Sequence, residues 1–289
     1  MKGSRLTRVE RIDRPSPESF IRNYLRPGRP VILTGIANEW RAAMWTPANL
    51  EERFGEVTIR YETWDGDERV DDPLEFASRQ RYFEATLAEY YRKLEQLGGP
   101  SRRLYSAGLA IPRVMPEARP ELGSLEAYMD LPGPARLRKR LQVDPLLWLG
   151  PAGTVSPLHF DRWHNFFVQL HGRKKWIILP PAQSDCVHWP YEGLGPALLH
   201  WSPVDVEHPD LARYPRFARA EPIDVIVEPG EILFMPVGWW HHVRALDPSI
   251  SVNFWWAKPI DSICSLRRYF YHYVRLSIGR SLRLGRAAP

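Results

Sequence analysis

The chain has 289 residues, of which 44% are hydrophobic and 25% are charged, and this composition predicts a soluble globular protein with a full core. It has no run of about eighteen apolar residues and no signal-peptide core, so we expect neither a membrane span nor secretion and place the protein in the cytoplasm. Its net charge of +5 permits an acidic partner without requiring one, and its two cysteines exclude a disulfide framework.

The first part of the chain predicts two short helices and two short strands. Residues 16–24 and 46–54 predict helices, because each range opens with a hydroxyl residue followed by a proline, which suits the cap and first turn of a helix. Residues 31–33 and 57–61 predict strands. The charged residues 65–72 predict a loop.

A longer helix is predicted over residues 82–97. Apolar and aromatic residues recur there at helical spacing, and a Gly-Gly-Pro sequence follows directly. We interpret this stripe as core packing. A strand is then predicted at residues 103–107, and the proline-rich residues 112–134 predict an irregular crossing with one helical turn near residues 125–129.

A β-barrel is predicted from about residue 104 to residue 258. Many short strands separated by Gly and Pro turns indicate a double-stranded β-helix, or jelly roll, so the predicted fold class is mainly β with flanking helices. Residues 146–150 are apolar throughout, which predicts burial of both faces. Further strands are expected at residues 165–170, 174–179, 223–227, 232–235 and 250–256.

Two further segments flank these strands. Residues 180–221 form a long polar insertion, which in a compact domain is usually functional or partly helical. Residues 259–286 place apolar and aromatic residues on one helical stripe and arginines on the other face. We therefore predict a domain over residues 1–258, with an N-terminal α/β lead-in, and a C-terminal helical extension over residues 259–289.

The sequence His159-Phe160-Asp161 carries the first chemical signal. Side chains alternate along a strand, so His159 and Asp161 are expected to point to the same face, opposite Phe160. Such a pair alone is a weak signal. A second histidine from a distant strand would complete the facial triad of two histidines and one carboxylate that holds non-haem Fe(II), and His241 and His242 are available.

These residues belong to a wider pattern. Lys174 follows on the next strand, a Pro-x-Gly-Trp-Trp-His-His-Val sequence spans residues 236–243, and an Asn-Phe-Trp sequence spans residues 253–255. Together they resemble the JmjC-type, cupin-fold oxygenases that use Fe(II) and 2-oxoglutarate, most nearly the cupin-like branch with the asparaginyl hydroxylase that inhibits hypoxia-inducible factor. The resemblance is clearest over residues 146–258. Because close members of that family dimerise through C-terminal helices, the apolar stripe of residues 259–286 is expected either to pack on the barrel or to form a homodimer.

The resemblance implies that His159, Asp161 and His241 bind iron and act in catalysis through it, leaving open positions for 2-oxoglutarate and dioxygen. His241 is preferred to His242 because the family pattern is His-x-hydrophobic and adjacent strand residues face opposite ways. Lys174 is the expected anchor of the far carboxylate of 2-oxoglutarate. Other residues implied to line the cosubstrate are Ser156, Tyr105, Asn165, Asn253 and Trp255.

Hydroxylation of a protein side chain is the leading functional hypothesis. One alternative is hydroxylation of a modified tRNA base or a small metabolite, which the arginines of residues 259–286 suggest. Another is a non-catalytic cupin-like binding module, against which the intact triad, Lys174 and Asn253 argue. Demethylation of a methyl-lysine uses the same chemistry, but nothing in the sequence resembles a histone-reading module, so hydroxylation is preferred.

Overall fold

The computed structural model describes residues 7–64, 79–98, 104–189 and 200–257. The loop predicted at residues 65–72 and the helix predicted within residues 259–286 lie outside the described residues. The predicted division of the chain at residue 258 therefore stays a prediction.

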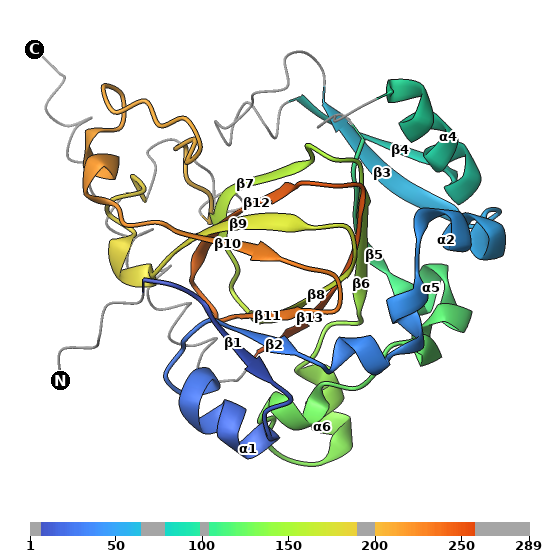
Figure 1. Ribbon diagram of the computed structural model, residues 1–289, viewed down its shortest axis with the longest axis horizontal. Helices are drawn as coiled ribbons and strands as arrows, with labels where there is room; N and C mark the ends of the chain where they lie inside the picture. Colours follow the sequence, from blue (N-terminus) through green and yellow to red (C-terminus); the bar gives the residue numbers. More distant parts are fainter. Residues whose placement is uncertain (1–6, 65–78, 99–103, 190–199, 258–289) are drawn as a thin grey trace, which may run out of the picture.

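Two β-sheets form the centre of the molecule (Figure 1). The larger sheet has the strand order β1 (Glu10–Asp13), β2 (Val31–Thr34), β11 (Ile232–Met235), β8 (His164–His171), β13 (Ser249–Trp256), β6 (Leu146–Gly150) and β5 (Ser106–Ala110). The smaller sheet has the order β10 (Ile223–Val227), β9 (Lys174–Leu179), β12 (Trp240–Ala245) and β7 (Val155–Phe160). The predicted jelly-roll class, mainly β with flanking helices, is confirmed.

The inner faces of the two sheets meet in a mixed apolar and polar interior. Phe167 of the larger sheet packs with Trp176 and Val243 of the smaller sheet. Because side chains alternate along each strand, the other inward positions of β8 and β13 include Asn165 and Asn253, which are both buried. The interior is therefore apolar at one set of positions and carries polar side chains at another.

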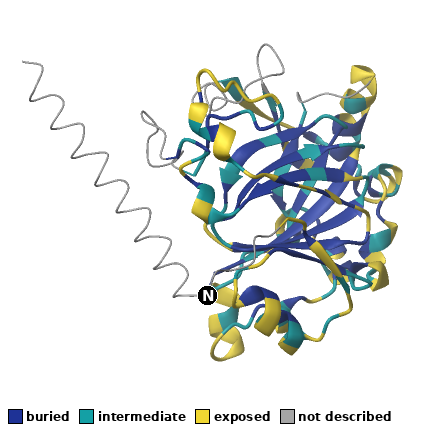
Figure 2. Cartoon of the chain, turned by 60° about the vertical axis from the view of Figure 1, so that its left-hand side comes forward, coloured by how far each residue is buried: buried dark blue, intermediate teal, exposed yellow. Residues whose placement is uncertain are grey.

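The outer faces of both sheets are covered. Phe20 from the N-terminal helices packs against Phe166 and Phe234 of the larger sheet, with ring centroids 5.4 and 5.0 Å apart. Residues 180–189 and 200–221 cover the outer face of the smaller sheet, where Trp240 is completely buried. Figure 2 shows the resulting pattern, with buried strands inside and exposed residues mainly on helices and loops.

The N-terminal helices begin where the sequence predicts. The Ser16 hydroxyl accepts a hydrogen bond from the backbone N–H of Ser19 ahead of α1 (Pro17–Phe20), which continues as a π-helical turn over Ile21–Leu25. The Thr46 hydroxyl does the same for the N–H of Asn49 ahead of α2 (Pro47–Phe54). These caps satisfy backbone donors that the first turn leaves unpaired.

The helix predicted over residues 82–97 is wrong in its first part. Strand β4 (Gln80–Thr86) pairs with β3 (Thr58–Trp64), and helix α4 (Leu87–Leu97) begins only after Thr86. Thr86 and Glu89 form a reciprocal capping box, in which each side chain accepts from the other residue's backbone N–H. Phe83 lies on the strand and is 49% exposed, so it is not part of the buried helical stripe.

The remaining described elements between β2 and β6 are short. They are the 3-10 turns Ala37–Glu39, Arg41–Met44, Pro116–Glu121 and Glu126–Tyr128, and the helices α5 (Ile111–Val114) and α6 (Ala135–Arg140). The strand predicted at residues 103–107 lies three residues later, as β5. Strand β6 is less buried than predicted, because Leu146 and Trp148 are only half-buried.

The described residues of the insertion include the 3-10 turns Pro181–Gln183 and Pro215–Arg219, and ion pairs on the surface link Asp185, which follows the first turn, to the second turn. Asp185 pairs with Arg219 at 2.7 Å and also with Arg216.

Among the described residues, no helix has both the length and the apolar character that crossing a bilayer requires.

Candidate metal centre

His159 and Asp161 lie at one end of β7, and His241 lies on the adjacent strand β12. His159 and His241 face each other in the antiparallel register of these strands, so both imidazoles point into the interior. The sequence predicts Asp161 on the strand, but β7 ends at Phe160. The carbonyl of Asp161 instead accepts a hydrogen bond of 2.9 Å from the N–H of Gly238, which ties this turn to the entrance of β12.

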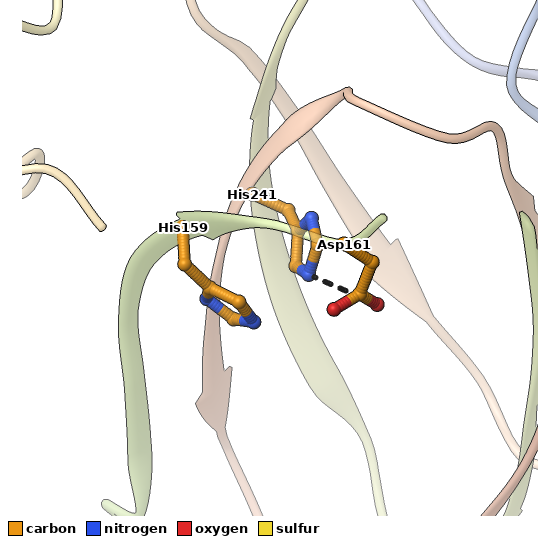
Figure 3. A group of neighbouring side chains, drawn as sticks. All are labelled: His159, Asp161 and His241. Atoms are coloured by element: carbon orange, nitrogen blue, oxygen red, sulfur yellow. Dashed lines mark ion pairs between the residues drawn. The ribbon is translucent and has the colours of Figure 1, made fainter. Parts of the chain in front are cut away.

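The three side chains converge (Figure 3). One potential ligand atom from each of His159, Asp161 and His241 lies within 4.8 Å of the other two. The His241 Nε2 atom is 3.9 Å from Asp161 Oδ2, and the two imidazole centroids are 4.2 Å apart. Among the described residues, this is the one group of three metal-ligating side chains so arranged.

Both histidines are oriented by their own backbone. His159 Nδ1 is 2.7 Å from the carbonyl of Pro157, and His241 Nδ1 is 3.0 Å from the carbonyl of Trp239. A carbonyl can only accept, so each Nδ1 carries the proton and each Nε2 presents its lone pair to the site. This arrangement fixes the tautomer and the ring orientation that a metal needs.

Burial also shifts the pKa values of His241 and Asp161. It holds the pKa of His241 well below its usual value, and the neighbouring His159 lowers it further, so the imidazole is neutral at physiological pH. Burial raises the pKa of the Asp161 carboxyl, while His159 and the indole of Trp255 oppose that rise. A cation between the three side chains would relieve the burial of an uncompensated carboxylate.

Lys174 lies on the same inner face of the smaller sheet as His241. Ile178 is opposite His241 in the β9–β12 register, so these two side chains share a face. Lys174 precedes Ile178 by four residues on β9, an even spacing, so its side chain also points inward. Lys174 is 3% exposed, and its Nζ donates to the Ser251 hydroxyl at 3.1 Å. No carboxylate of the described residues forms an ion pair with it, and burial lowers its pKa to about 7.

Tyr105 and Ser156 lie beside Lys174. The Lys174 Nζ is 5.6 Å from the centroid of the Tyr105 ring and 5.4 Å from that of Phe167. Burial and the nearby Glu62 raise the pKa of Tyr105, and a hydrogen bond with Ser156 opposes the rise. The phenol is therefore a neutral hydroxyl next to a buried ammonium.

Two further buried side chains have unsatisfied oxygen atoms. Asn165 and Asn253 are 1% and 5% exposed, and neither Oδ1 atom has a hydrogen-bond partner within the described structure. Buried polar atoms are normally paired, so these two indicate space for a polar group or water. Trp255, on the same face of β13 as Asn253, lies beside Asp161.

Comparison with known families adds to this geometry. Residues 17–262 match the family of cupin-like domains. The chain belongs to this family. The match includes every strand of both sheets except β1, and all the residues that converge in the interior. The more specific likeness to the asparaginyl hydroxylase branch stays an expectation from the motifs.

Several named proteins contain a cupin-like domain similar to this chain. Lysine-specific demethylase 8 of Xenopus tropicalis is 34% identical over 260 residues, covering 87% of this chain and 53% of the relative. Lysine-specific demethylase JMJ30 of Arabidopsis thaliana is 31% identical over 266 residues, covering 89% and 57%. HSPB1-associated protein 1 of Homo sapiens is 28% identical over 247 residues, covering 78% and 47%. The chain thus spans about half the length of these relatives.

Within this cupin-like domain, His242 lies on the opposite face from His241. Its Nε2 is 3.8 Å from Glu207, a residue of the insertion that also accepts hydrogen bonds from Arg244 at 2.8 and 3.0 Å. The preference for His241 over His242 agrees with this placement. Lys175 likewise faces away from Lys174 and pairs with Asp224 at 3.1 Å.

Two neighbours of the cupin-like site were not among the predicted site residues. Ser251 is the hydrogen-bond partner of Lys174, and its position two residues before Asn253 on the same strand face is a signal that could have identified it. Trp201, from the insertion, stacks on His159 with centroids 5.0 Å apart and planes at 23°. No local pattern shows that this tryptophan contacts β7.

Proposed function

We propose that the protein is an Fe(II)- and 2-oxoglutarate-dependent oxygenase that acts on a protein side chain. One observation carries the proposal: an open three-residue ligand group and a buried ammonium without a carboxylate partner lie on the same inner face. His159, Asp161 and His241 would hold Fe(II), since two neutral imidazoles and one carboxylate leave coordination positions open. A closed structural zinc site would instead use four protein ligands.

Lys174 would hold the far carboxylate of 2-oxoglutarate. Its only hydrogen-bond acceptor among the described residues is Ser251, so a buried anion would satisfy a charge that the protein leaves uncompensated. Tyr105 and Ser156 present hydroxyl groups beside this ammonium. A charge-assisted hydrogen bond of this kind contributes about 1.5–3 kcal/mol, which is enough to govern cosubstrate affinity.

The other residues would orient the cosubstrate and exclude water. Asn165 and Asn253 line the same interior with unpaired Oδ1 atoms, and their amides can rotate to offer an acceptor or a donor. When bound together, Fe(II), 2-oxoglutarate and dioxygen supply an oxidant for a substrate C–H bond, with succinate and carbon dioxide as coproducts. The protein therefore needs no separate acid–base pair, and its contribution is ligand orientation and a dry pocket.

The outcome of the reaction is proposed as hydroxylation, with loss of an N-methyl group as the alternative. Two of the relatives are named lysine-specific demethylases, which supports a protein substrate and keeps the second outcome in view. The two outcomes share one oxidation. A hydroxylated C–H group is stable, whereas a hydroxylated N-methyl group decomposes to the free amine and formaldehyde.

Succinate formation is the test of this proposal. The whole chain is supplied with Fe(II), ascorbate and 2-oxoglutarate, and a pool of protein-derived peptides is added with and without methylated lysines. We expect succinate to rise when a substrate peptide is present. Mass spectrometry of the peptides then separates a gain of one oxygen from the loss of a methyl group with formaldehyde release.

The matched control is His159→Ala, which removes one ligand and leaves Lys174 in place. Succinate formation equal to that of His159→Ala under every condition would favour the non-catalytic binding module. Stimulation by tRNA but not by peptides, with binding that falls steeply between low and moderate salt, would favour the nucleic-acid substrate.

A further inference from the structure

A second pocket lies outside the barrel, on the other side of the larger sheet from Lys174. It has a volume of about 620 Å³ and is lined by α2, α4, the turn after β6 and the start of β13. Figure 1 shows both helices outside the sheet that carries β6 and β13. Ile250, which lines this pocket, belongs to the outer core of the larger sheet, whereas the next residue, Ser251, faces Lys174 in the interior. The pocket shares no lining residue with the metal centre.

The size and walls of this pocket suit a small organic molecule. Ligand sites typically occupy about 300–1,000 Å³ and are mostly apolar with a few polar groups. Here the apolar walls come from prolines, alanines and Leu94, while two carboxylates, Glu51 and Glu95, stand on neighbouring helices. No Lys or Arg is among the described lining residues, although the whole chain has a net charge of +5. The local charge is therefore opposite to that of the protein.

Two buried hydroxyl groups give an independent indication of a ligand. Tyr91 and Ser249 both line the pocket and are 7% and 3% exposed. Neither hydroxyl has a hydrogen-bond partner in the described structure, although buried polar atoms are normally paired. Burial and the neighbouring Glu51 raise the pKa of Tyr91, so its phenol stays protonated and can donate or accept.

Within the described part of the chain, the two carboxylates also have no ion-pair partner. Neither Glu51 nor Glu95 forms an ion pair with another described residue. Glu51 is half-buried and Glu95 is exposed, so a bound cation would gain a solvent-screened attraction to both carboxylates without displacing a described ion-pair partner. Its apolar body would cover Leu94 and the prolines, and its polar end would lie near the Tyr91 phenol.

From this we infer that the pocket between α2, α4 and the start of β13 binds a small organic cation with an apolar body, such as an arylalkylamine. The site is separate from the metal centre, because the thickness of the larger sheet lies between them. Recognition rests on Glu51 and Glu95 for the charge and on the apolar walls for the body of the ligand.

Phenylbutylamine and its neutral counterpart phenylbutanol form a matched pair of probes. Each is titrated into the full chain by ligand-observed NMR, with 2-oxoglutarate present and absent. We expect the amine to bind about two- to tenfold more tightly than the alcohol, because solvent screens the attraction to carboxylates that are partly or fully exposed. Binding should be independent of 2-oxoglutarate and should weaken as salt is added.

Three variants locate the site. The double variant Glu51→Gln/Glu95→Gln should lose about two- to tenfold in amine affinity. Glu52→Gln, on the exposed side of the same helix and outside the lining, should change nothing. Ala48→Trp places a bulky ring at an exposed lining position of the first turn of α2, and should block both probes without unfolding the protein.

Several results would overturn the inference. Equal affinity for amine and alcohol would exclude charge recognition, and full binding to Ala48→Trp would place the probe elsewhere. Competition with 2-oxoglutarate would assign the amine to the barrel interior. Absence of binding by the wild-type chain up to about 10 mM probe would show that the pocket is not a ligand site.

Discussion

Replacement of Lys174 by methionine should make the protein more stable while removing its cosubstrate site. Methionine keeps an unbranched side chain of similar length without the charge. Burial moves the pKa of Lys174 from 10.5 to about 7. Each pKa unit corresponds to about 1.36 kcal/mol, so the buried ammonium destabilises the folded state by at most about 5 kcal/mol. Replacing buried charges by well-packed apolar groups stabilises by about 1–4 kcal/mol, and we expect a gain within that range at neutral pH.

The pH dependence gives this prediction a sign. The folded pKa lies below the unfolded one, so between about pH 7 and 10.5 the unfolded chain binds more protons at this residue than the folded chain does. The destabilisation is fully present below about pH 7 and disappears as the pH rises towards 10.5. The stability difference between Lys174→Met and the wild-type chain should therefore shrink with rising pH.

Urea unfolding of both proteins near neutral pH and again at about pH 9 measures this difference. Added 2-oxoglutarate should raise the free energy of unfolding of the wild type and leave that of the variant unchanged, since only a folded chain with Lys174 binds it. A variant less stable than the wild type at neutral pH, or a stability difference that is the same at both pH values, would refute the account of Lys174 as a buried, uncompensated charge.

Three shorter predictions follow from other sites. His241→Ala should abolish Co(II) binding followed by absorption, whereas His242→Ala should retain it, and the reverse result would contradict the assigned strand faces. Gly172→Ala should lower the free energy of unfolding by at least about 1–3 kcal/mol in urea, because Gly172 has φ +68° and a Cβ there would meet the Pro248 carbonyl at 2.2 Å. Thr86→Ala should lower it by about 0.5–2 kcal/mol through loss of the α4 cap, and an unchanged midpoint would show that the capping box contributes nothing.

Much of the fold is readable from local sequence chemistry. The helices after Ser16 and Thr46 begin at their hydroxyl caps, and the hairpin between β8 and β9 turns at a glycine with positive φ. Period-two alternation also assigns Ser251 and Asn253 to the inner face of β13, opposite the face of Val252. These features depend on a few neighbouring residues, which is why a single sequence is sufficient for them.

Features that depend on distant partners could not be predicted in this way. The apolar residues within the range 80–86 are compatible with either a helix or a strand. Hydrogen bonding to β3 stabilises the strand. Asp161 was expected on β7, but the hydrogen bond from Gly238 holds it in the turn beyond. The positions of Trp201 over His159 and of Glu207 beside His242 depend on how the insertion folds back, which no local pattern encodes.

The placement of residues 200–202 has a consequence for how an extended polypeptide could approach the metal centre. Strand β7 is the last strand of the smaller sheet, and its outer backbone groups would otherwise be free to pair with a guest strand. The backbone N–H of Phe160 already donates to the backbone carbonyl of His200 at 3.0 Å. The backbone N–H of Ser202 donates to the carbonyl of Leu158 at 2.9 Å. These two hydrogen bonds occupy the edge of β7 next to His159, so a guest chain cannot extend the sheet at this point.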